Sequence, residues 1–304
     1  MFETISNCPL CDSGEIIIVH NDIQDYLCHY SGNFQISECL ECDHVFLSKR
    51  PVEKYIGKYY EQGYYTHSKP NQYIVFLKKI LQYFHITSKP SLDLFGNGKV
   101  LDVGCGNGSF LLPWIDKKWE VYGVDIDNKA INFARKNLPE GNFYTGDITS
   151  SHISSLTFSY INLSHVLEHI YDVNRFIVAL LPVSNPDTTI QISVPRYNCL
   201  ESRVFGKYWR GLEPPRHIHH FTIVSLIKLM EKNGYKMIMR KNQSLPMCFV
   251  ESVSHVLKDK GYFDLDRHHR IKSTLYFLVY FPHKISSYFF KSNSMTVSFQ
   301  KNHD

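Results

Sequence analysis

Positive charge is missing from the beginning of the chain. Residues 1–48 contain no lysine or arginine, although they carry several acidic side chains: Glu3, Asp12, Glu15, Asp22, Asp25, Glu38, Glu41 and Asp43. Over all 304 residues the net charge is only +4, and the basic residues are scattered along the sequence. A nucleic-acid-binding protein usually gathers lysine and arginine in a stripe that neutralises phosphates. The composition therefore argues against a nucleic-acid partner.

A leader sequence and long apolar runs are absent as well. The chain opens Met1-Phe2-Glu3-Thr4, without the basic start and apolar run of a signal peptide. The apolar stretch 275–281 is far shorter than the roughly 20 residues that cross a bilayer, and Pro282 follows it. We therefore expect a cytoplasmic protein. Residues 273–290 are helix-like and apolar, so they could either pack inside the protein or make a peripheral contact with a membrane surface.

Cysteine is present in two C-x-x-C pairs, separated by residues 12–38: Cys8, Cys11, Cys39 and Cys42. In a reducing compartment such pairs indicate metal binding more than disulfides. Four thiolates suit a closed tetrahedral zinc site, and the strand-like residues 15–20, 33–37 and 44–47 predict a zinc ribbon over residues 1–50. A redox function fits less well, because neither pair opens a helix after a strand.

Strands and helices alternate beyond residue 96. The predicted strands are 99–103, 120–124, 142–145, 158–163, 188–194, 235–240 and 294–300, and the predicted helices are 108–117, 128–137, 172–181, 222–233 and parts of 250–290. This alternation is typical of an α/β domain with a mainly parallel sheet, here residues 96–304. Residues 51–95 have helical apolar spacing at 71–86 and are expected to form a connector or lid over the active site.

A glycine-rich loop follows the first of these strands. The segment Lys99–Phe110 contains Gly104, Gly106 and Gly108 after Asp102. Glycine lets the backbone turn sharply and approach a ligand, and free N–H groups at a helix start favour an anionic group. A dinucleotide site needs G-x-G-x-x-G or G-x-G-x-x-A, but this register gives Ser109 at the last position.

Gly104-x-Gly106-x-Gly108 preceded by Asp102 resembles motif I of class I methyltransferases that use S-adenosyl-L-methionine (SAM). The resemblance implies a Rossmann-like seven-stranded sheet and a SAM site at this loop. The next strand ends at Asp125, beside Ile126, where a carboxylate can accept the ribose hydroxyls. By the same resemblance Asp147 and Ile148 flank the adenine. Taken singly, Asp125 and Asp147 could instead be helix caps or turn formers.

The fourth strand of the α/β region leads into the segment Ile161–Ile170. It resembles the family segment that passes under the methionine part of SAM and borders the acceptor. Leu163 to His165 would then line the cofactor, with His165 also a candidate catalytic residue. Glu168 and His169 could simply begin a helix.

A segment rich in aromatic residues, arginine and histidine runs from residue 195 to residue 222. Trp209 to Phe221 resembles a W-x-x-x-x-P-P-R-H-x-x-x-F signature of methyltransferases common among bacterial surface-polysaccharide and secondary-metabolite genes. His217 is a candidate general base, because imidazole titrates near neutrality. Alternatively Arg216 and His217 brace the loop and Thr222 caps the next helix. A zinc site made of His217, His219 and His220 fits less well, because no neighbouring cysteine or acid completes it.

A zinc ribbon before a SAM domain resembles the sugar C-methyltransferases that act on nucleotide-linked keto-deoxysugars. Those enzymes carry a further C-terminal domain, whereas residues 294–300 here are predicted to form the last strand of the SAM-binding sheet. We therefore expect methyl transfer to a small molecule or glycan, with O-methylation of a sugar or sugar-linked intermediate in polysaccharide biosynthesis as the leading hypothesis. An RNA or protein methyltransferase that grips its substrate with the ribbon is the alternative, and a SAM-binding scaffold without activity is a third hypothesis.

Overall fold

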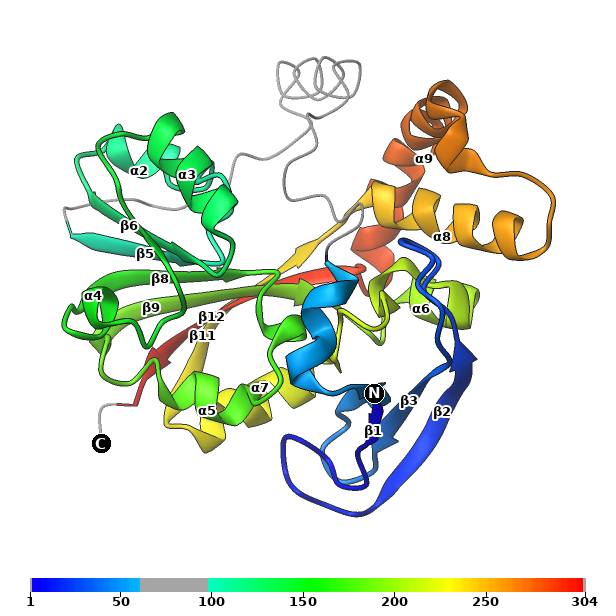
Figure 1. The fold of residues 1–304 in the computed structure, drawn as a ribbon, viewed down its shortest axis with the longest axis horizontal. Helices are drawn as coiled ribbons and strands as arrows, with labels where there is room; N and C mark the ends of the chain where they lie inside the picture. Colours follow the sequence, from blue (N-terminus) through cyan, green and yellow to red (C-terminus); the bar gives the residue numbers. More distant parts are fainter. Residues whose placement is uncertain (1, 61–97, 303–304) are drawn as a thin grey trace.

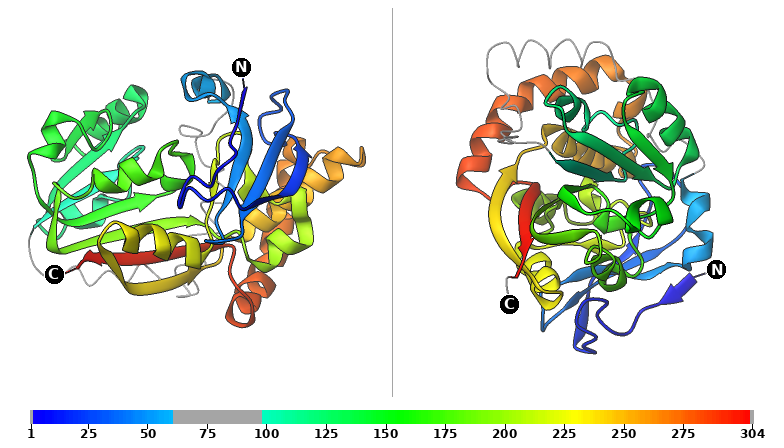
Figure 2. Two further views of the ribbon diagram at one scale, coloured as in Figure 1. Left: turned by 90° about the horizontal axis from the view of Figure 1, so that it is seen from below. Right: turned by 90° about the vertical axis from the view of Figure 1, so that its left-hand side faces the viewer.

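A computed structural model describes residues 2–60 and 98–302 of the chain (Figure 1). The helix predicted at 71–86, and with it most of the predicted connector, lies outside these residues. The described part contains two sheets: a seven-stranded sheet and a smaller sheet formed mainly by the N-terminal residues. Figure 2 shows the smaller sheet in blue at one end of the larger one.

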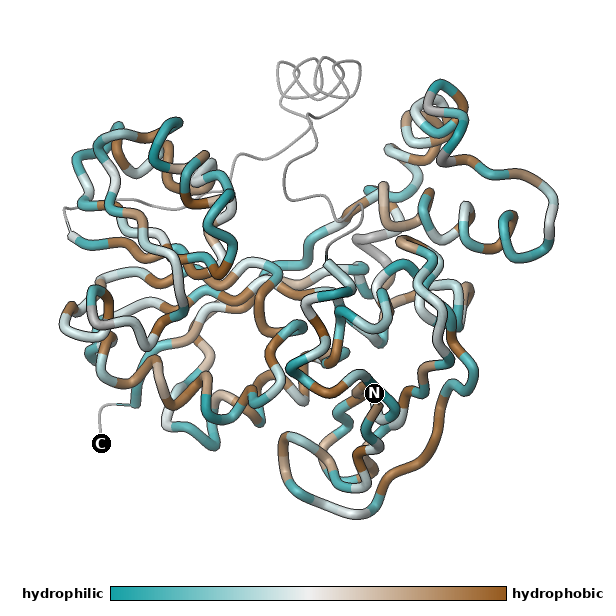
Figure 3. Tube along the Cα trace, viewed as in Figure 1, coloured by the Kyte–Doolittle hydropathy of each residue, from teal (hydrophilic) through white to brown (hydrophobic). Residues whose placement is uncertain are grey.

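The seven-stranded sheet has the order β11-β12-β9-β8-β5-β6-β7. Its strands β5 to β9 are parallel to one another, and β12 is antiparallel to both neighbours. All seven strands predicted between residues 99 and 300 are confirmed, and the bounds are β5 Lys99–Val103, β6 Glu120–Asp125, β7 Asn142–Thr145, β8 Phe158–Ser164, β9 Ser184–Pro195, β11 Tyr235–Gln243 and β12 Ser294–Lys301. Hydrophobic residues recur along these strands (Figure 3).

Helices cover both faces of this sheet: α2 Leu112–Ile115, α3 Asn128–Asn137, α4 Ser151–Ser154, α5 Val173–Val178 and α7 Ile223–Lys232. Consecutive residues of a strand point to opposite faces. Val100 accordingly packs with Trp114 of α2 and Ile131 of α3, whereas Leu101 belongs to the core that contains residues of α5 and α7. Two layers of helices therefore enclose the sheet, with an apolar core on each of its faces.

Two helix predictions were too long. The helix predicted at 108–117 is only the turn Leu112–Ile115, because Gly108 has a left-handed φ of 75° and the chain turns again before Pro113. The helix predicted at 172–181 ends at Val178. Thr222 caps α7, as the alternative interpretation of this segment expected, and forms a reciprocal capping box with Ser225.

The smaller sheet has the order β1-β4-β3-β2, and its strands are β1 Phe2–Thr4, β2 Ile16–Ile23, β3 Phe34–Cys39 and β4 Val45–Pro51. The last three confirm the predicted strands, and the 3₁₀ helix η1 Glu53–Tyr59 follows. A fifth strand, β10 His219–His220, pairs with β4 and was not predicted. The core under this sheet is shared too, since Phe34 and Ile36 pack with Trp209 and Ile218.

A third group of elements lies beyond the carboxyl ends of the parallel strands. Helix α6 Leu200–Phe205 follows β9, and α8 Pro246–Asp259 and α9 His269–Phe289 form an insertion between β11 and β12. The short 3₁₀ helices η3 Gly206–Tyr208, η4 Arg210–Leu212 and η5 Leu265–Arg267 complete the group. None of the helices in the described ranges is long and apolar enough to cross a membrane.

A buried ionic network joins the smaller sheet to the 195–222 segment. The Arg216 guanidinium donates to both carboxylate oxygens of Asp25, from Nη2 at 2.7 Å and from Nη1 at 2.9 Å. Its Nε donates to Glu213 Oε1 at 3.1 Å. The side chains of Asp25 and Arg216 are 1% and 0% exposed. A two-pronged arginine–carboxylate contact fixes orientation as well as distance, so the network locks the two segments together.

We predict that Asp25→Asn lowers the free energy of unfolding by about 3–5 kcal/mol, because it leaves the buried Arg216 guanidinium without its bidentate carboxylate. Urea unfolding followed by circular dichroism measures this change. Glu120→Gln is the control, because it breaks the exposed Lys99–Glu120 pair at 3.8 Å and should cost less than about 1 kcal/mol. Equal effects of the two substitutions would contradict the proposed importance of the network.

Candidate functional site

The ends of the parallel strands form the edge at which the predicted site residues gather. Strand β5 lies between β6 and β8, so the connections that follow β5 and β8 leave the sheet on different sides. Such a switch point opens a crevice at the carboxyl ends of the strands, where ligands of open α/β sheets bind. Figure 1 shows α6, α8 and the smaller sheet facing this edge.

The glycine loop after β5 depends on left-handed backbone angles. Gly104, Gly106 and Gly108 have φ values of 70°, 53° and 75°. A Cβ placed on Gly104 would lie 2.7 Å from Val166 Cγ2, closer than real atoms approach, whereas the position of a Cβ on Gly106 is open. The loop therefore packs closely against Val166 at Gly104, whereas the space beside Gly106 is free.

Asp125 ties the end of β6 to this loop. Its Oδ2 accepts the Gly106 N–H at 2.9 Å, and its Oδ1 accepts the Asp127 N–H at 2.9 Å. The alternative that Asp125 caps the following helix is wrong, because Asp127 caps α3 and accepts from Lys129 N–H. Beside Asp125, the Ile126 side chain is 84% exposed, which is unusual for isoleucine and leaves an apolar surface at the edge of the sheet.

Three of the predicted cofactor residues lie beneath this edge. Asp102 is buried and its Oδ1 accepts from Asn162 Nδ2 at 2.7 Å. Burial raises the pKa of the Asp102 carboxyl to about 7, since the charged form loses its hydration. The side chains of Ile148 and Leu163 are buried in the main core. Contacts from these three residues to a ligand at the edge would therefore come through the loop or the backbone.

Asp147 is exposed after β7 and also stabilises a turn. Its Oδ1 accepts the Thr149 N–H at 2.9 Å and the Thr149 hydroxyl at 2.6 Å. The turn-forming alternative is thus observed. It does not exclude ligand contact, because the carboxylate stays at the surface.

His165 follows β8 with a left-handed φ of 57°, an uncommon conformation that is enriched at functional sites. Its Nδ1 lies 2.9 Å from Glu168 Oε1, and its side chain is 43% exposed while that of Glu168 is 0% exposed. Burial favours the neutral ring, but the hydrogen bond and charge of Glu168 outweigh it and raise the pKa of His165. The arrangement orients the ring through Nδ1, and part of the imidazole stays exposed.

Glu168 is the centre of a wider cluster that the sequence did not predict. One ligand atom each from Glu168, His169 and His217 lies within 4.8 Å of the others. Glu168 Oε2 is buried and has no hydrogen-bond partner among the described residues. In the sequence, the Leu-Glu-His run of residues 167–169 indicated only the start of a helix and not a cluster with His217. Such a set could take a cation or share protons between its imidazoles.

His217 is braced within the 195–222 segment. It is 6% exposed, and its Nδ1 lies 2.9 Å from the Gly211 carbonyl oxygen. Burial lowers the pKa of His217 to about 4, although Glu213 opposes this shift. Arg216 is buried in the ionic network, so the contacts match the bracing alternative for both residues.

The three close histidines do not gather around one point. His219 Nδ1 lies 2.8 Å from His44 Nε2, and its Nε2 lies 2.9 Å from the Ile170 carbonyl oxygen. Among the residues with described coordinates, only His217 of the three joins a group of possible metal ligands, and its partners there are Glu168 and His169. The His217–His219–His220 zinc alternative is therefore not supported by the geometry.

The two cysteine pairs meet at one point of the smaller sheet. The sulfurs of Cys8 and Cys42 are 3.5 Å apart, as are those of Cys11 and Cys39, and all four lie within 4.8 Å. The two turns have matching geometry: Asp12 and Asp43, each following a pair, have φ values of 63° and 57°. Zinc–sulfur bonds of about 2.3 Å would place tetrahedral sulfurs about 3.8 Å apart, so the cluster fits that ion.

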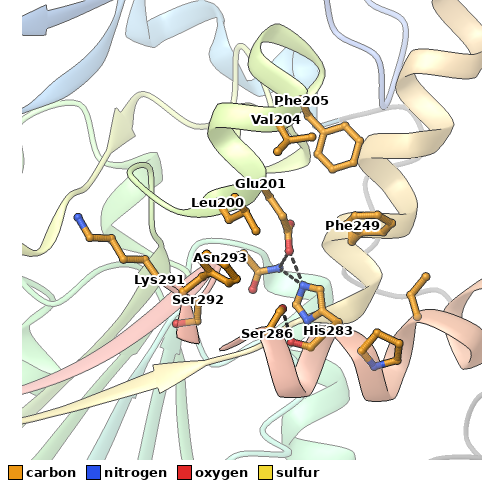
Figure 4. Close-up of a pocket in the computed structure, with 13 residues that line it drawn as sticks. Leu200, Glu201, Val204, Phe205, Phe249, His283, Ser286, Lys291, Ser292 and Asn293 are labelled. Carbon is orange, nitrogen blue, oxygen red and sulfur yellow. Dashed lines mark hydrogen bonds and ion pairs between the residues drawn. The ribbon is translucent and has the colours of Figure 1, made fainter. Parts of the chain in front are cut away.

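A separate cavity of about 270 Å³ lies among α6, α8 and α9 (Figure 4), and no residue of the glycine loop lines it. Its walls are largely apolar. In Figure 4 the side chains of Glu201, His283 and Asn293 point toward one another, and Asn293 Nδ2 donates to Glu201 Oε1 at 2.8 Å. None of the predicted cofactor residues lines it.

Comparison with known proteins places this geometry in a family. A family model described as "Methyltransferase domain" matches residues 67–239, more than half of the chain. The chain belongs to this family. The predictions of a Rossmann-like fold and of a SAM-dependent methyltransferase domain are thereby confirmed.

Two curated relatives extend this comparison. The methyltransferase chain is 23% identical over 130 residues to malonyl-[acyl-carrier protein] O-methyltransferase of Serratia marcescens, covering 43% of this chain and 50% of the relative. It is 29% identical over 105 residues to ubiquinone biosynthesis O-methyltransferase of Azoarcus sp. (strain BH72), covering 33% and 45%. The chain thus spans about half the length of the curated relatives it matches.

Among solved structures, the PH0226 protein from Pyrococcus horikoshii OT3 is similar to the methyltransferase chain. The match has a TM-score of 0.48 and 15% identity, and it covers 81% of this chain and 99% of that protein.

Proposed function

We propose that the protein transfers the methyl group of SAM to an oxygen atom of a small molecule or glycan, in particular a sugar or a sugar-linked intermediate. The observation that carries this proposal is the His165–Glu168 pair at the end of β8, with the glycine loop in contact with Val166. A hydroxyl group is a poor nucleophile until it loses its proton, so an O-methyltransferase gains from a base beside the methyl donor. Both relatives described above are O-methyltransferases by name.

The sugar acceptor is supported by the 195–222 segment, which resembles the signature of surface-polysaccharide methyltransferases. Trp209 packs in the core shared with the smaller sheet, and Arg210 donates to Glu251 of α8, so contacts on both sides fix the segment. Aromatic and charged groups on a rigid scaffold are suited to hold a polar, ring-shaped acceptor.

The residues at the glycine loop fit SAM in shape and chemistry. The open space at Gly106 leaves room for the cofactor close to the backbone, and the Asp125 carboxylate would accept hydroxyl donors of the ribose. Ile126 and Asp147 would border the adenine, while Asp102 ties β5 to β8 through Asn162 just before the loop begins. SAM supplies the reactive methyl group on a sulfonium when it is bound.

His165 would act as the general base through its Nε2. Glu168 holds Nδ1 and so fixes the ring, and the raised pKa strengthens the ring as a proton acceptor. As the acceptor oxygen bonds to the methyl carbon and the carbon–sulfur bond breaks, the hydroxyl proton passes to His165. His217 would position the cluster from its buried site and keep its ring neutral.

We predict that the purified protein transfers labelled methyl groups from SAM to one of a panel of nucleotide sugars and glycans. His165→Asn should lower kcat by about a hundredfold or more, because a positioned base contributes at least that much. His29→Asn is the matched control, since both histidines have left-handed φ angles that asparagine tolerates. Label in lipids, RNA or protein but in no carbohydrate would contradict the sugar acceptor.

The pH dependence of kcat should report His165. Because only the neutral ring accepts a proton, kcat is lost as pH falls through the pKa of His165, with a midpoint above the ordinary value of about 6.5. Glu168→Gln removes the cause of the raised pKa and should move the midpoint down and reduce kcat. Calorimetric binding of S-adenosylhomocysteine should stay unchanged. If the midpoint of the kcat profile lies at the same pH in Glu168→Gln as in the unchanged protein, His165 held by Glu168 is not the base.

We also propose that Cys8, Cys11, Cys39 and Cys42 hold a structural zinc ion and that residues 1–50 are a zinc ribbon. The sulfur separations support this, and so does the position of the cluster at a closed end of the smaller sheet with three of the four cysteines buried. A closed four-sulfur site serves folding and leaves no position for a substrate.

We predict about one zinc ion per chain by elemental analysis, and loss of that ion in Cys39→Ser with a fall in melting temperature. Cys248→Ser, which lies outside the cluster, should keep its zinc. A four-sulfur protein free of zinc after preparation in zinc-containing medium would refute the assignment.

A further inference from the structure

Helix α9 is apolar on two sides. On its inner side Tyr276 and Tyr280 are buried against Val250 of α8, with Ser273 on the same stripe. A surface helix needs one such apolar stripe, and its opposite side is normally polar. In α9 the opposite side is apolar too, and the packing among residues 2–60 and 98–302 does not account for it.

The outer face of α9 is defined here by five exposed residues: Ile271, Phe277, Leu278, Phe281 and Ile285. Leu278 is 66% exposed and Ile285 is 58% exposed. Residues seven apart in an α-helix lie nearly in line, and the positions 271, 278 and 285 have this spacing. The outer face therefore carries an apolar strip along the helix, interrupted by the exposed Thr274.

Two further apolar residues are exposed near the ends of α9. Phe290 follows the helix and is exposed, and Tyr262 in the loop before it is 75% exposed. A groove between Leu257, Phe263 and the first half of α9 adds further apolar wall. Extended apolar patches are rare on proteins that work alone in water, so this one indicates a binding surface.

The charged residues of α9 itself are all basic. Residues 269–289 include Arg270, Lys272 and Lys284 but no aspartate or glutamate. Arg270 is exposed beside the strip and Lys291 is exposed after it. Acidic residues enter only from outside the helix, where Glu251 pairs with Lys272 and Asp264 pairs with Arg267. We therefore expect a partner that offers an apolar region to the strip and negative charge to the basic residues beside it.

We propose that α9 lies on the surface of an anionic lipid bilayer, with its outer face in the boundary between headgroups and acyl chains. Apolar side chains on one face combined with basic residues are the pattern of helices that rest in this layer. The helix is not apolar enough to cross the membrane, so it lies along the surface. The surface is formed by the insertion between β11 and β12 and is independent of the identity of the methyl acceptor.

The test is co-sedimentation of the full-length protein with vesicles of phosphatidylcholine alone or of phosphatidylcholine with phosphatidylglycerol. Binding should be strong only with phosphatidylglycerol and should fall as salt rises. The double variant Leu278→Ser/Ile285→Ser should bind at least tenfold more weakly, since two large apolar side chains no longer enter the bilayer. Its control is Val178→Ser, an exposed apolar position on α5.

Charge is tested separately. Arg270→Glu/Lys291→Glu should weaken binding to phosphatidylglycerol vesicles more than tenfold, because each basic residue near an anionic surface is worth roughly a factor of five. Lys117→Glu/Lys136→Glu makes the same change at exposed positions after α2 and in α3, outside the α8–α9 insertion, and should bind normally. S-adenosylhomocysteine binding confirms that each variant is folded and keeps this test separate from the proposed function.

Two outcomes would overturn the proposal. One is the absence of vesicle binding by the unchanged protein at low salt. The other is a sedimentation velocity experiment in which Leu278→Ser/Ile285→Ser converts a dimer to a monomer while vesicle binding stays as it was, because the outer face would then cover a second copy of the chain.

Discussion

The arrangement of side chains at the carboxyl ends of the parallel strands depends on the buried carboxylate of Glu168. A carboxylate with 0% exposure is costly unless nearby groups compensate its charge, and here His165, His169 and His217 surround it. These imidazoles, His165 first among them, outweigh the effect of burial and lower the pKa of Glu168. The backbone takes part as well, because the Glu168 carbonyl oxygen accepts the Ile218 N–H at 2.7 Å. One residue thus joins the end of β8 to the 195–222 segment.

The smaller sheet secures the other side of that segment. β10 adds to β4, and Arg216 reaches Asp25 through two hydrogen bonds. The cysteine turns are held in turn by the helices on the main sheet, since Lys232 donates to the Leu10 carbonyl oxygen at 2.9 Å and Asn174 donates to the Pro9 carbonyl oxygen at 2.7 Å. A metal-stiffened ribbon would therefore set the position of β4, and through β10 the position of the segment that carries His217.

Much of the fold could be predicted from local patterns. The seven strands of the main sheet and the glycine loop are encoded by apolar runs, glycine and their order, so the sequence located them closely. β10 could not be found this way, because a two-residue strand has no periodicity and exists only through its pairing with β4, in which His219 lies opposite Phe46, 173 residues earlier in the chain. The predicted helix at 108–117 was longer than α2, because helical spacing does not reveal that Gly108 has a left-handed backbone.

The site was predicted unevenly for the same reason. Asp125 was located by its place at the end of a strand, which is local information. Glu168 was undervalued, since its importance comes from His217 lying close in space and from the burial that surrounds both. Asp127, and not Asp125, caps α3. The two carboxylates are only two residues apart, so the sequence alone did not distinguish them. Long-range packing decides which of several suitable side chains meets the others.

The central claim is that buried Glu168 poises His165 to accept a proton, and an NMR titration of the His165 ring measures it most directly. Selective labelling of histidine Cε1, with assignment by His165→Asn, gives the pKa of this one imidazole in the protein and in Glu168→Gln. The account predicts a pKa above the ordinary value of about 6.5 in the unchanged protein and a clear fall in Glu168→Gln. Equal pKa values in the two proteins would contradict it.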